Sequence, residues 1–365
     1  MSCGHGVTHT DSFEDNVANH TDHQPRHGAS LLPRVRVNSY NAELRDEWGF
    51  VGDRANKRAF QERLDNWRRK LRLSSDDPLD SVPTGELYKD KHGLQQVLLT
   101  GDAEAAGLLL GAIEDYAQEL AKVIDRLLAF DGWQHTERIS VGGGFREGRV
   151  GELAIGRTSV LLKTMGRKID LVPIRHHPDD AGLIGCVGLI APEVLSGNSS
   201  LLAIDIGGTN FRAGIVATDG VSTAGCRRAR VTARKVWRHA DEQPTRDDAV
   251  RKLVDMLGTL LERAAQEGVT LAPLVCVACP GRIASDGSIE RGGQNLPGDW
   301  EAAGFNLPSI LHQQLVRDFD WIASVLMHND AVVQGLSELP FMRDVEHWGA
   351  LTIGTGLGNA HFTNR

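Results

Sequence analysis

The sequence predicts an α/β protein, and three observations point to this class. Apolar runs of strand length alternate with segments of helical periodicity over most of the chain after residue 31, which is the pattern of α/β folds. Several strand-like runs end in glycine-rich turns, at residues 142–144, 207–209 and 354–358. At 365 residues with 41% hydrophobic side chains, the chain is long enough for two domains with cores of their own.

The composition excludes several classes of function. Charged residues make up 24% of the chain and the net charge is −8, which argues against nonspecific nucleic-acid binding. No apolar run reaches membrane-spanning length, and the N-terminus lacks a signal-peptide pattern. The five cysteines are scattered without a disulfide-scaffold spacing. We therefore expect a cytoplasmic protein with neither a nucleic-acid nor a membrane partner.

The front of the chain begins with a tail and continues into helices. Residues 1–30 are polar, contain several histidines and lack periodicity, so we expect disorder, with metal binding as the alternative. Alternating valines predict a short strand near residues 35–39. Apolar residues at helical spacing predict an amphipathic helix over 55–73. Asp102 is a good N-cap for a long apolar helix that follows it.

A short strand at residues 138–141 leads into Gly142, Gly143 and Gly144. Three glycines after a strand leave room for a flat ligand against bare backbone, although a flexible loop explains them equally well. The expected elements that follow are a helix or turn followed by a strand over 151–162, a strand at 169–174, a small-residue-rich helix at 180–195 and a linker at 196–200.

The stretch from Leu201 to Asp219 organises the second half. It predicts a strand to Ile206, a turn of two glycines and Thr209, and a return strand at 211–217. Glycines let backbone N–H groups converge on an anion, and the adjacent Asp205 suits Mg²⁺ held through water. An ordinary hairpin is the alternative. The further expected elements are strands at 227–237, 274–278, 321–327, 348–353 and 359–363, and helices at 247–266, 306–316 and 331–338.

Asp330 is the candidate catalytic acid. It follows an apolar strand and precedes a helix, with Asn329 beside it, which is where α/β enzymes place reactive groups. An Asp that accepts the proton of an attacking hydroxyl recurs in phosphoryl transfer. A simple helix N-cap is the alternative. About twenty residues later, Gly354-Thr355-Gly356 forms a second glycine turn suited to phosphates.

Together these motifs resemble the sugar kinases of the ROK family (repressors, open reading frames, kinases), in its glucokinase-like branch. The matching pieces are Asp205-Ile206-Gly207-Gly208-Thr209-Asn210, Asn295-Leu296-Pro297-Gly298-Asp299-Trp300, Asn329-Asp330-Ala331 and Gly354-Thr355-Gly356-Leu357-Gly358. The resemblance implies the two-lobed ribonuclease-H-like fold of the actin/hexokinase superfamily, with the active site between the lobes. It also implies ATP-dependent phosphorylation of glucose or a related hexose, at the 6-OH.

The resemblance also implies roles for individual residues. Asp330 would be the general base, and Asp205 would hold Mg²⁺ through water. The sugar would contact Asn295, Asn329, Glu47 and, by a weaker match, Glu86. Mg²⁺-ATP would lie on Gly207, Gly208, Thr209, Asn210, Gly354, Thr355, Gly356, Gly142, Gly143 and Gly144.

The family's order of parts is rotated in this chain. Segments similar to its later half come first, at residues 47–50, 101–144 and 181–186. We therefore expect a circular permutation, in which the strand near residues 35–39 lies in the same sheet as residues 359–363. The expected lobes are 31–195 with 349–365, on the adenosine side, and 201–348, which holds the first phosphate motif, the sugar loop and Asp330.

Two departures from the family concern zinc. Phe50 stands where the family has a zinc-ligand histidine, and the family's cysteine cluster has no counterpart. We therefore predict no structural zinc. The alternatives to an active kinase are a ROK-type transcriptional regulator and a sugar-binding protein without catalysis. The identity of the sugar and a homodimeric state are left open.

Overall fold

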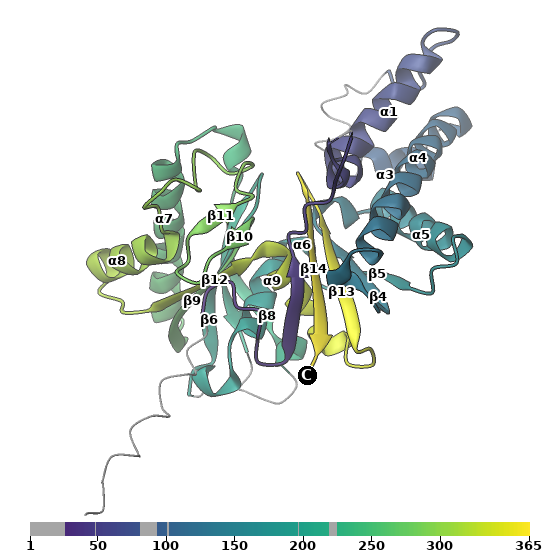
Figure 1. Ribbon diagram of the computed structural model, residues 1–365. Coiled ribbons are helices and arrows are strands. Elements are labelled where there is room, and N and C mark those ends of the chain that lie inside the picture. Colours follow the sequence, from purple (N-terminus) through teal and green to yellow (C-terminus); the bar gives the residue numbers. More distant parts are fainter. Residues whose placement is uncertain (1–25, 48, 81–92, 101, 196, 219–224) are drawn as a thin grey trace, which may run out of the picture.

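The structure is a computed structural model that describes residues 26–47, 49–80, 93–100, 102–195, 197–218 and 225–365. It has two five-stranded sheets, one in each of two lobes (Figure 1). Two short ribbons accompany them: β2 (Arg45–Asp46) with β3 (Gly49–Phe50), and β10 (Arg282–Ile283) with β11 (Ile289–Arg291). The predicted two-lobed α/β fold is confirmed.

Sheet B, as we name it, lies in the lobe formed by the second half of the chain. Its strand order is β12-β9-β6-β7-β8. The strands are β6 (Ser200–Ile206), β7 (Phe211–Ala217), β8 (Arg230–Trp237), β9 (Leu271–Cys279) and β12 (Ser324–Asn329). Strands β6, β7 and β8 are antiparallel, whereas β9 and β12 run parallel to β6. Strand β6 is buried along its whole length, as expected for a mostly apolar run at the centre of a sheet.

Sheet A repeats this pattern with a different chain order. Its strand order is β5-β4-β13-β14-β1. The strands are β1 (Val35–Tyr40), β4 (Arg138–Gly142), β5 (Asp170–Pro173), β13 (His347–Ile353) and β14 (Leu357–Asn364). Strands β13, β14 and β1 are antiparallel, and β4 and β5 run parallel to β13. The edge position that β8 holds in sheet B is therefore filled in sheet A by β1, the first strand of the chain.

The pairing of β1 with β14 confirms one sequence prediction directly. Val35 lies opposite Asn364 and Val37 opposite Phe362, so the purple and yellow strands run side by side in Figure 1. The backbone N–H of Arg365 donates to Arg34 O at 3.0 Å. Residues from opposite ends of the sequence thus share one sheet.

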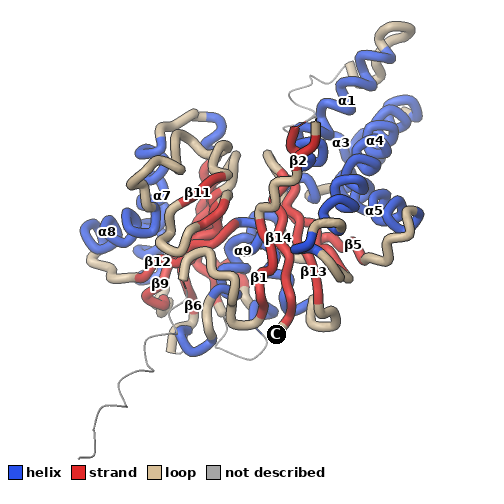
Figure 2. Tube along the Cα trace, viewed as in Figure 1, coloured by secondary structure: helices blue, strands red, loops and turns tan. Residues whose placement is uncertain are grey.

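Helices cover both outer faces and fill the space between the sheets (Figure 2). Outside sheet A lie α1 (Lys57–Leu71), α3 (Gly93–Thr100), α4 (Ala103–Leu128) and α5 (Arg149–Thr164). Outside sheet B lie α7 (Arg246–Gln266) and α8 (Leu307–Phe319). Between the sheets lie α6 (Pro178–Gly185) and α9 (Asp330–Glu338).

Helix α4 forms as the sequence predicts. The side chain of Asp102 caps it by accepting a hydrogen bond from Ala105 N–H, and its wide apolar face is buried in the sheet A lobe. Within the described residues no single helix is long and apolar enough to cross a membrane; the bent pair Gly93–Leu99 and Ala103–Leu128 passes that test by length and composition alone.

Helices α6 and α9 pack closely enough to require glycine. A Cβ built on Gly185 would lie 1.7 Å from Val333 O. One apolar core includes both helices together with strands of sheet A and sheet B. The predicted lobe division assigns α6 and α9 to opposite lobes, and the structure packs them together at the centre.

Two predicted elements differ in the structure. The segment 151–162, predicted as a helix or turn followed by a strand, is helical throughout in α5. Val150, Ala154 and Leu162 share one buried face at helical spacing, which outweighs the β-branched residues. The helix predicted over 180–195 ends at Gly185 and continues as two short 3-10 turns, the second of which begins at Pro192.

The predicted tail is wrong for its last residues, because residues 26–30 lie along β12. Gly28 N–H donates to Met327 O at 3.1 Å, and Met327 N–H donates to His27 Nδ1 at 3.0 Å. The ring of His328 bonds Ala29 O at 3.0 Å. This segment therefore supports the strand that leads to Asn329. Residues 1–25 lie outside the described part of the chain.

Candidate active site

The first phosphate motif forms the turn between β6 and β7. Gly207 N–H donates to Asn210 O at 3.0 Å, which closes the turn. The Nε2 atom of the buried His239 forms a hydrogen bond with Gly207 O at 2.8 Å. Burial lowers the pKa of His239, which favours the neutral ring. The backbone of this turn is thus held in place by a histidine that the sequence motifs do not include.

The second motif occupies the equivalent position in sheet A, between β13 and β14. Gly354 N–H donates to Gly356 O at 2.9 Å, and Gly354 O accepts from Lys57 N–H at 3.0 Å. The hydroxyls of Thr209 and Thr355 are 2.9 Å apart. The two predicted phosphate turns therefore touch across the lobes, through threonines that are 146 residues apart in the sequence.

The Gly142–Gly144 turn lies beside the second motif, as predicted. Gly142 pairs with Thr352 at the end of β4 and β13. Gly143 has φ +85°, and a Cβ built on it would lie 2.4 Å from Ile353 O. No atom lies within 4 Å of a Cβ built on Gly144 or Gly354. The turn thus presents bare backbone next to open space.

Asn329, rather than Asp330, is the N-cap of α9. Its Oδ1 accepts hydrogen bonds from Ala331 N–H and Val332 N–H at 3.0 and 3.2 Å. Its Nδ2 donates to Gly281 O at 2.9 Å and to Asp330 Oδ1 at 3.2 Å. An amide offers two donor and two acceptor positions. In this structure these four bonds make Asn329 a support for Asp330, and its contact with a sugar stays a prediction.

Asp330 is the first residue of α9 and keeps part of its surface accessible. Desolvation by the surrounding protein and then the negative charge of Asp205 raise the pKa of Asp330 to about 7. Hydrogen bonds from Ala331 N–H and the Asn329 amide oppose this rise. A carboxyl group with a pKa near neutrality can accept a proton from a hydroxyl and later release it.

Asp205 is the buried end of an ion-pair chain whose centre is Arg212. It is 2% exposed and lies directly opposite Arg212 in the β6–β7 hairpin. Arg212 Nη1 donates to Asp205 Oδ2 at 3.2 Å, and Arg212 Nε donates to Asp179 Oδ1 at 2.9 Å. Burial raises the pKa of Asp205, whereas Arg212 lowers it. A Cβ built on Gly182 of α6 would lie 2.5 Å from Asp205 Cγ, so glycine is what lets α6 approach.

Asn295 lies where the two phosphate turns meet. It is exposed, and its Cβ is 3.0 Å from the position of a Cβ on Gly208. Its Nδ2 is 3.5 Å from the position of a Cβ on Gly356. The side chain is therefore available to a ligand held between the turns.

Among the described residues, no contact places a predicted sugar-binding glutamate at this site. Glu47 is exposed in the turn between β2 and β3. Glu86 lies outside the described residues. Arg212, His239 and Lys57 contact the site and were missed by motif reasoning. For Arg212 a signal existed, because a hairpin with its turn at 207–210 must pair residue 212 with Asp205.

Comparisons with known proteins support the predicted resemblance over part of the chain. No protein-family model matches. The chain is 31% identical over 166 residues, 45% of its length, to a glucokinase from Thermotoga maritima. That match spans 44% of the glucokinase, so the chain covers less than half of this curated relative. Over this stretch the chain is a homologue of a sugar kinase.

Solved structures give partial and distant similarities. A ROK family glucokinase from Streptomyces griseus, in complex with glucose and AMPPNP, is 19% identical over 46% of each chain, with a TM-score of 0.32. A ROK hexokinase from Thermus thermophilus is 21% identical over 44% of this chain and 45% of its own, with a TM-score of 0.29. A Ppx/GppA phosphatase from Aquifex aeolicus is 14% identical over 68% and 88%, with a TM-score of 0.33.

Proposed function

We propose that this protein transfers the γ-phosphoryl group of ATP to a hydroxyl of a hexose, the 6-OH of glucose or a related sugar. The observation that supports this best is the position of Asp330. Its carboxyl group, with a pKa near 7, lies beside Asp205 at the end of β6, where the first phosphate turn begins. That turn touches the second one through Thr209 and Thr355. A base and two phosphate turns are the parts that phosphoryl transfer to a hydroxyl requires.

In this proposal each group has a separate task. The backbone N–H groups of the two glycine turns bind the phosphates of ATP, and Asn295 binds sugar hydroxyls with its exposed amide. Asp330 accepts the proton of the attacking hydroxyl as the oxygen–phosphorus bond forms and ADP leaves. Asn329 holds Asp330 through its Nδ2. The open space above Gly144 and Gly354 is where the adenosine side of ATP would lie.

The carboxylates of the site fit a magnesium ion. Asp205 offers oxygen ligands, which Mg²⁺ prefers, and Asp330 lies close enough to feel its charge. Among the residues that the structure describes, no group of three His, Cys, Asp or Glu side chains could hold a metal ion by itself. Asp205 is the residue that would hold Mg²⁺, through water. When bound, Mg²⁺ would neutralise phosphate charge.

The metal requirement can be measured on purified protein. We expect phosphoryl transfer to depend on Mg²⁺, and elemental analysis to find no stoichiometric zinc, since Phe50 replaces the family's ligand. A variant lacking residues 1–25 serves as control, because histidines in that segment can bind metal adventitiously. One tightly bound zinc per chain in that variant would contradict the prediction.

We further propose that the chain is a circular permutation of the two-lobed kinase fold. The support comes from within the molecule, because sheet A and sheet B share one pattern of strand directions. In sheet B the three antiparallel strands β6, β7 and β8 follow one another in the chain. In sheet A the antiparallel strands β13 and β14 are followed in space by β1, from the other end of the chain. Chain order does not alter a fold when the joined ends lie close together.

A reordered gene tests this proposal. Residues 200–365 would be joined through a short turn to residues 34–195, since Arg365 N–H already bonds Arg34 O. The control is the natural order without residues 1–33, which also lacks the segment along β12. We expect both proteins to unfold cooperatively and to phosphorylate the same sugar. A reordered chain without a cooperative transition, beside a folded control, would refute the permutation.

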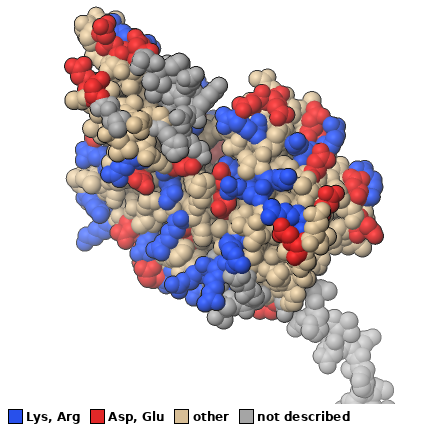
Figure 3. Space-filling model, turned by 180° about the vertical axis from the view of Figure 1, so that it is seen from behind, with Lys and Arg blue, Asp and Glu red and all other residues tan. Residues whose placement is uncertain are grey.

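The alternatives to a kinase are a sugar-responsive regulator and a non-catalytic sugar-binding protein. Acidic and basic side chains are mixed over the face seen from behind, on either side of a hollow between the lobes (Figure 3). Release of ADP with a panel of hexoses tests the proposal. Hexose-dependent release at least about 10²-fold above the sugar-free rate would support it. Sugar binding without turnover, or salt-sensitive DNA binding, would favour the alternatives. We propose a cytoplasmic protein with a sugar as its partner.

A further inference from the structure

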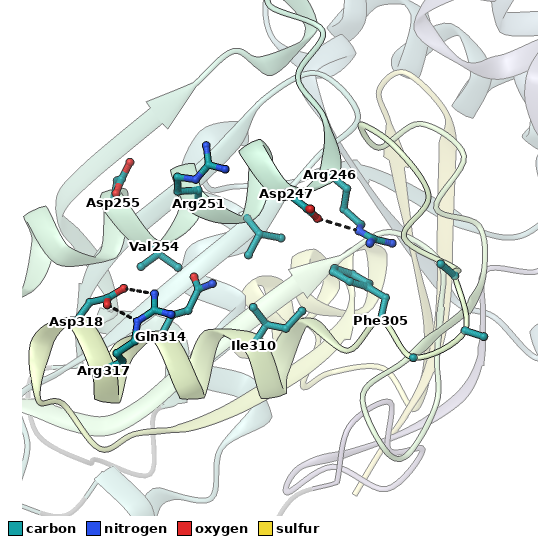
Figure 4. Close-up of a pocket in the computed structure, with 14 residues that line it drawn as sticks. Arg246, Asp247, Arg251, Val254, Asp255, Phe305, Ile310, Gln314, Arg317 and Asp318 are labelled. Atoms are coloured by element: carbon teal, nitrogen blue, oxygen red, sulfur yellow. Dashed lines mark hydrogen bonds and ion pairs between the residues drawn. The ribbon is translucent and has the colours of Figure 1, made fainter.

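A cavity lies outside the proposed active site, between α7 and α8 (Figure 4). Its volume is about 760 Å³. The apolar part of its wall comes from Val250, Val254, Phe305 and Ile310. Arg246, at the first position of α7, forms the end of the cavity nearest the segment that follows Trp300. One end of the cavity therefore adjoins the predicted sugar loop, residues 295–300.

Arg246 contacts this loop in several ways. Its Nη1 donates to Asp299 O at 2.5 Å. A Cβ built on Gly298, which has φ +77°, would lie 3.0 Å from Arg246 Cβ. The guanidinium group also stacks on Phe305, with its carbon 4.4 Å from the ring centroid. The planar group thus fixes both the outer turn of the loop and the segment that follows it.

The other interactions of Arg246 are too weak to explain its position. Its Nε lies 3.6 Å from Asp247 Oδ1, whose side chain is 80% exposed, and exposed ion pairs contribute little. The Nε atom is buried and has no hydrogen-bond partner among the described residues. A buried donor without a partner is unfavourable. The contacts to Asp299 and Phe305 are therefore the ones that favour this conformation.

The inner part of the loop is held differently. Leu296 and Trp300 are buried in the core of the sheet B lobe, and Trp300 Nε1 donates to Pro297 O at 2.8 Å. Glu301 Oε1 accepts from Gly293 N–H at 2.8 Å, which ties the two ends of the loop together. The turn at Gly298 and Asp299 is the part that depends on a side chain from another element.

We propose that Arg246 is a positioning residue that sets the affinity for the sugar. It acts through the turn at Gly298 and Asp299, which lies three residues from Asn295. Asn295 must lie between Gly208 and Gly356 to bind the sugar. If the turn at Gly298 and Asp299 is loosened, the Asn295 side chain also occupies positions from which it cannot reach the sugar. The role of the loop in sugar binding rests on the proposed function, whereas the clamp on the loop rests on contacts alone.

Arg246→Ala and Arg246→Lys test the inference, with Arg251→Ala as the matched control. Arg251 also lies on α7 and lines the same cavity, but its ion pair is with the half-buried Asp248 on the same helix. Loss of a charge-assisted hydrogen bond and a stacked cation should raise the KM for hexose about ten-fold in Arg246→Ala. The kcat and the KM for ATP should stay within about two-fold. Lysine can still donate to Asp299 O but cannot stack as a plane, so it should recover part of the affinity.

Hydrogen exchange gives a readout that does not depend on activity. Amides of residues 293–301 should exchange about ten-fold faster in Arg246→Ala than in Arg251→Ala. Equal exchange in the two variants would show that Arg246 does not hold the turn at Gly298 and Asp299, whether or not the protein phosphorylates sugars. Faster exchange with an unchanged KM for hexose would overturn the link to affinity. If the wild-type protein phosphorylates no hexose, the proposed function is wrong. The exchange rates still test whether Arg246 holds the loop.

Discussion

Replacing Asp330 by Asn should lower kcat by at least about 10²-fold, the scale of a lost general base, while hexose affinity stays within a few-fold. The amide has nearly the same shape and can keep the hydrogen bonds at the start of α9, but it cannot accept the proton of the sugar hydroxyl. Steady-state kinetics with separate sugar and ATP titrations measure the effect. Asp255→Asn, an exposed site on α7, serves as control. Turnover of Asp330→Asn equal to that of the control would remove Asp330 from the mechanism.

The same variant should be more stable than the wild type at alkaline pH. The folded pKa of Asp330 is about 7, against about 3.9 in an unfolded chain. Between these values the unfolded carboxyl has lost its proton and the folded one retains it, so wild-type stability falls as the pH rises. The amide does not ionise. Because Asp330 keeps some solvent contact, we expect Asp330→Asn to gain about 1–3 kcal/mol at pH 8 and almost nothing at pH 4.

Replacing Gly143 by Ala should destabilise the protein by at least about 2 kcal/mol. The residue has φ +85°, and its new Cβ would lie 2.4 Å from Ile353 O. The clash falls on backbone at the point where β4 joins β13, so neighbouring side chains cannot relieve it by rotating. Urea denaturation measures the loss. Gly156→Ala, in α5 with open space around it, should change stability by less than about 1 kcal/mol.

Gly144 gives a contrasting result within the same turn. No atom lies within 4 Å of its built Cβ, and its φ is not positive, so Gly144→Ala should leave stability almost unchanged. If ATP lies against this backbone, the added methyl group enters the nucleotide space and the KM for ATP rises several-fold. An unchanged KM for ATP in Gly144→Ala would show that the nucleotide lies elsewhere.

The parts of the molecule that the sequence predicted well are those governed by local pattern. The buried run to Ile206 and the two glycines after it determine a central strand and a tight turn without help from the rest of the chain. The pairing of β1 with β14 could also be predicted, because the circular permutation that the resemblance implies would make these segments neighbours.

What the sequence did not predict depends on contacts between distant residues. His239 reaches Gly207 O only because β8 brings it behind the turn. The segment at residues 26–30 is polar and lacks periodicity, yet it finds hydrogen-bond partners on the edge of β12. The motif resemblance predicts a sugar contact for Asn329 but does not predict that its amide caps α9. Polar residues have several possible partners, and only the fold selects among them.

The identity of the phosphorylated product tests the central proposal most directly. The protein would be incubated with Mg²⁺, ATP and each of a panel of hexoses, and the products followed by ³¹P NMR. We predict that at least one hexose gives a sugar phosphate in amounts equal to the ADP formed, with the phosphate on the 6-OH, and that Asp330→Asn gives at least about 10²-fold less. Formation of inorganic phosphate alone, or no ATP consumption with any hexose, would contradict the account.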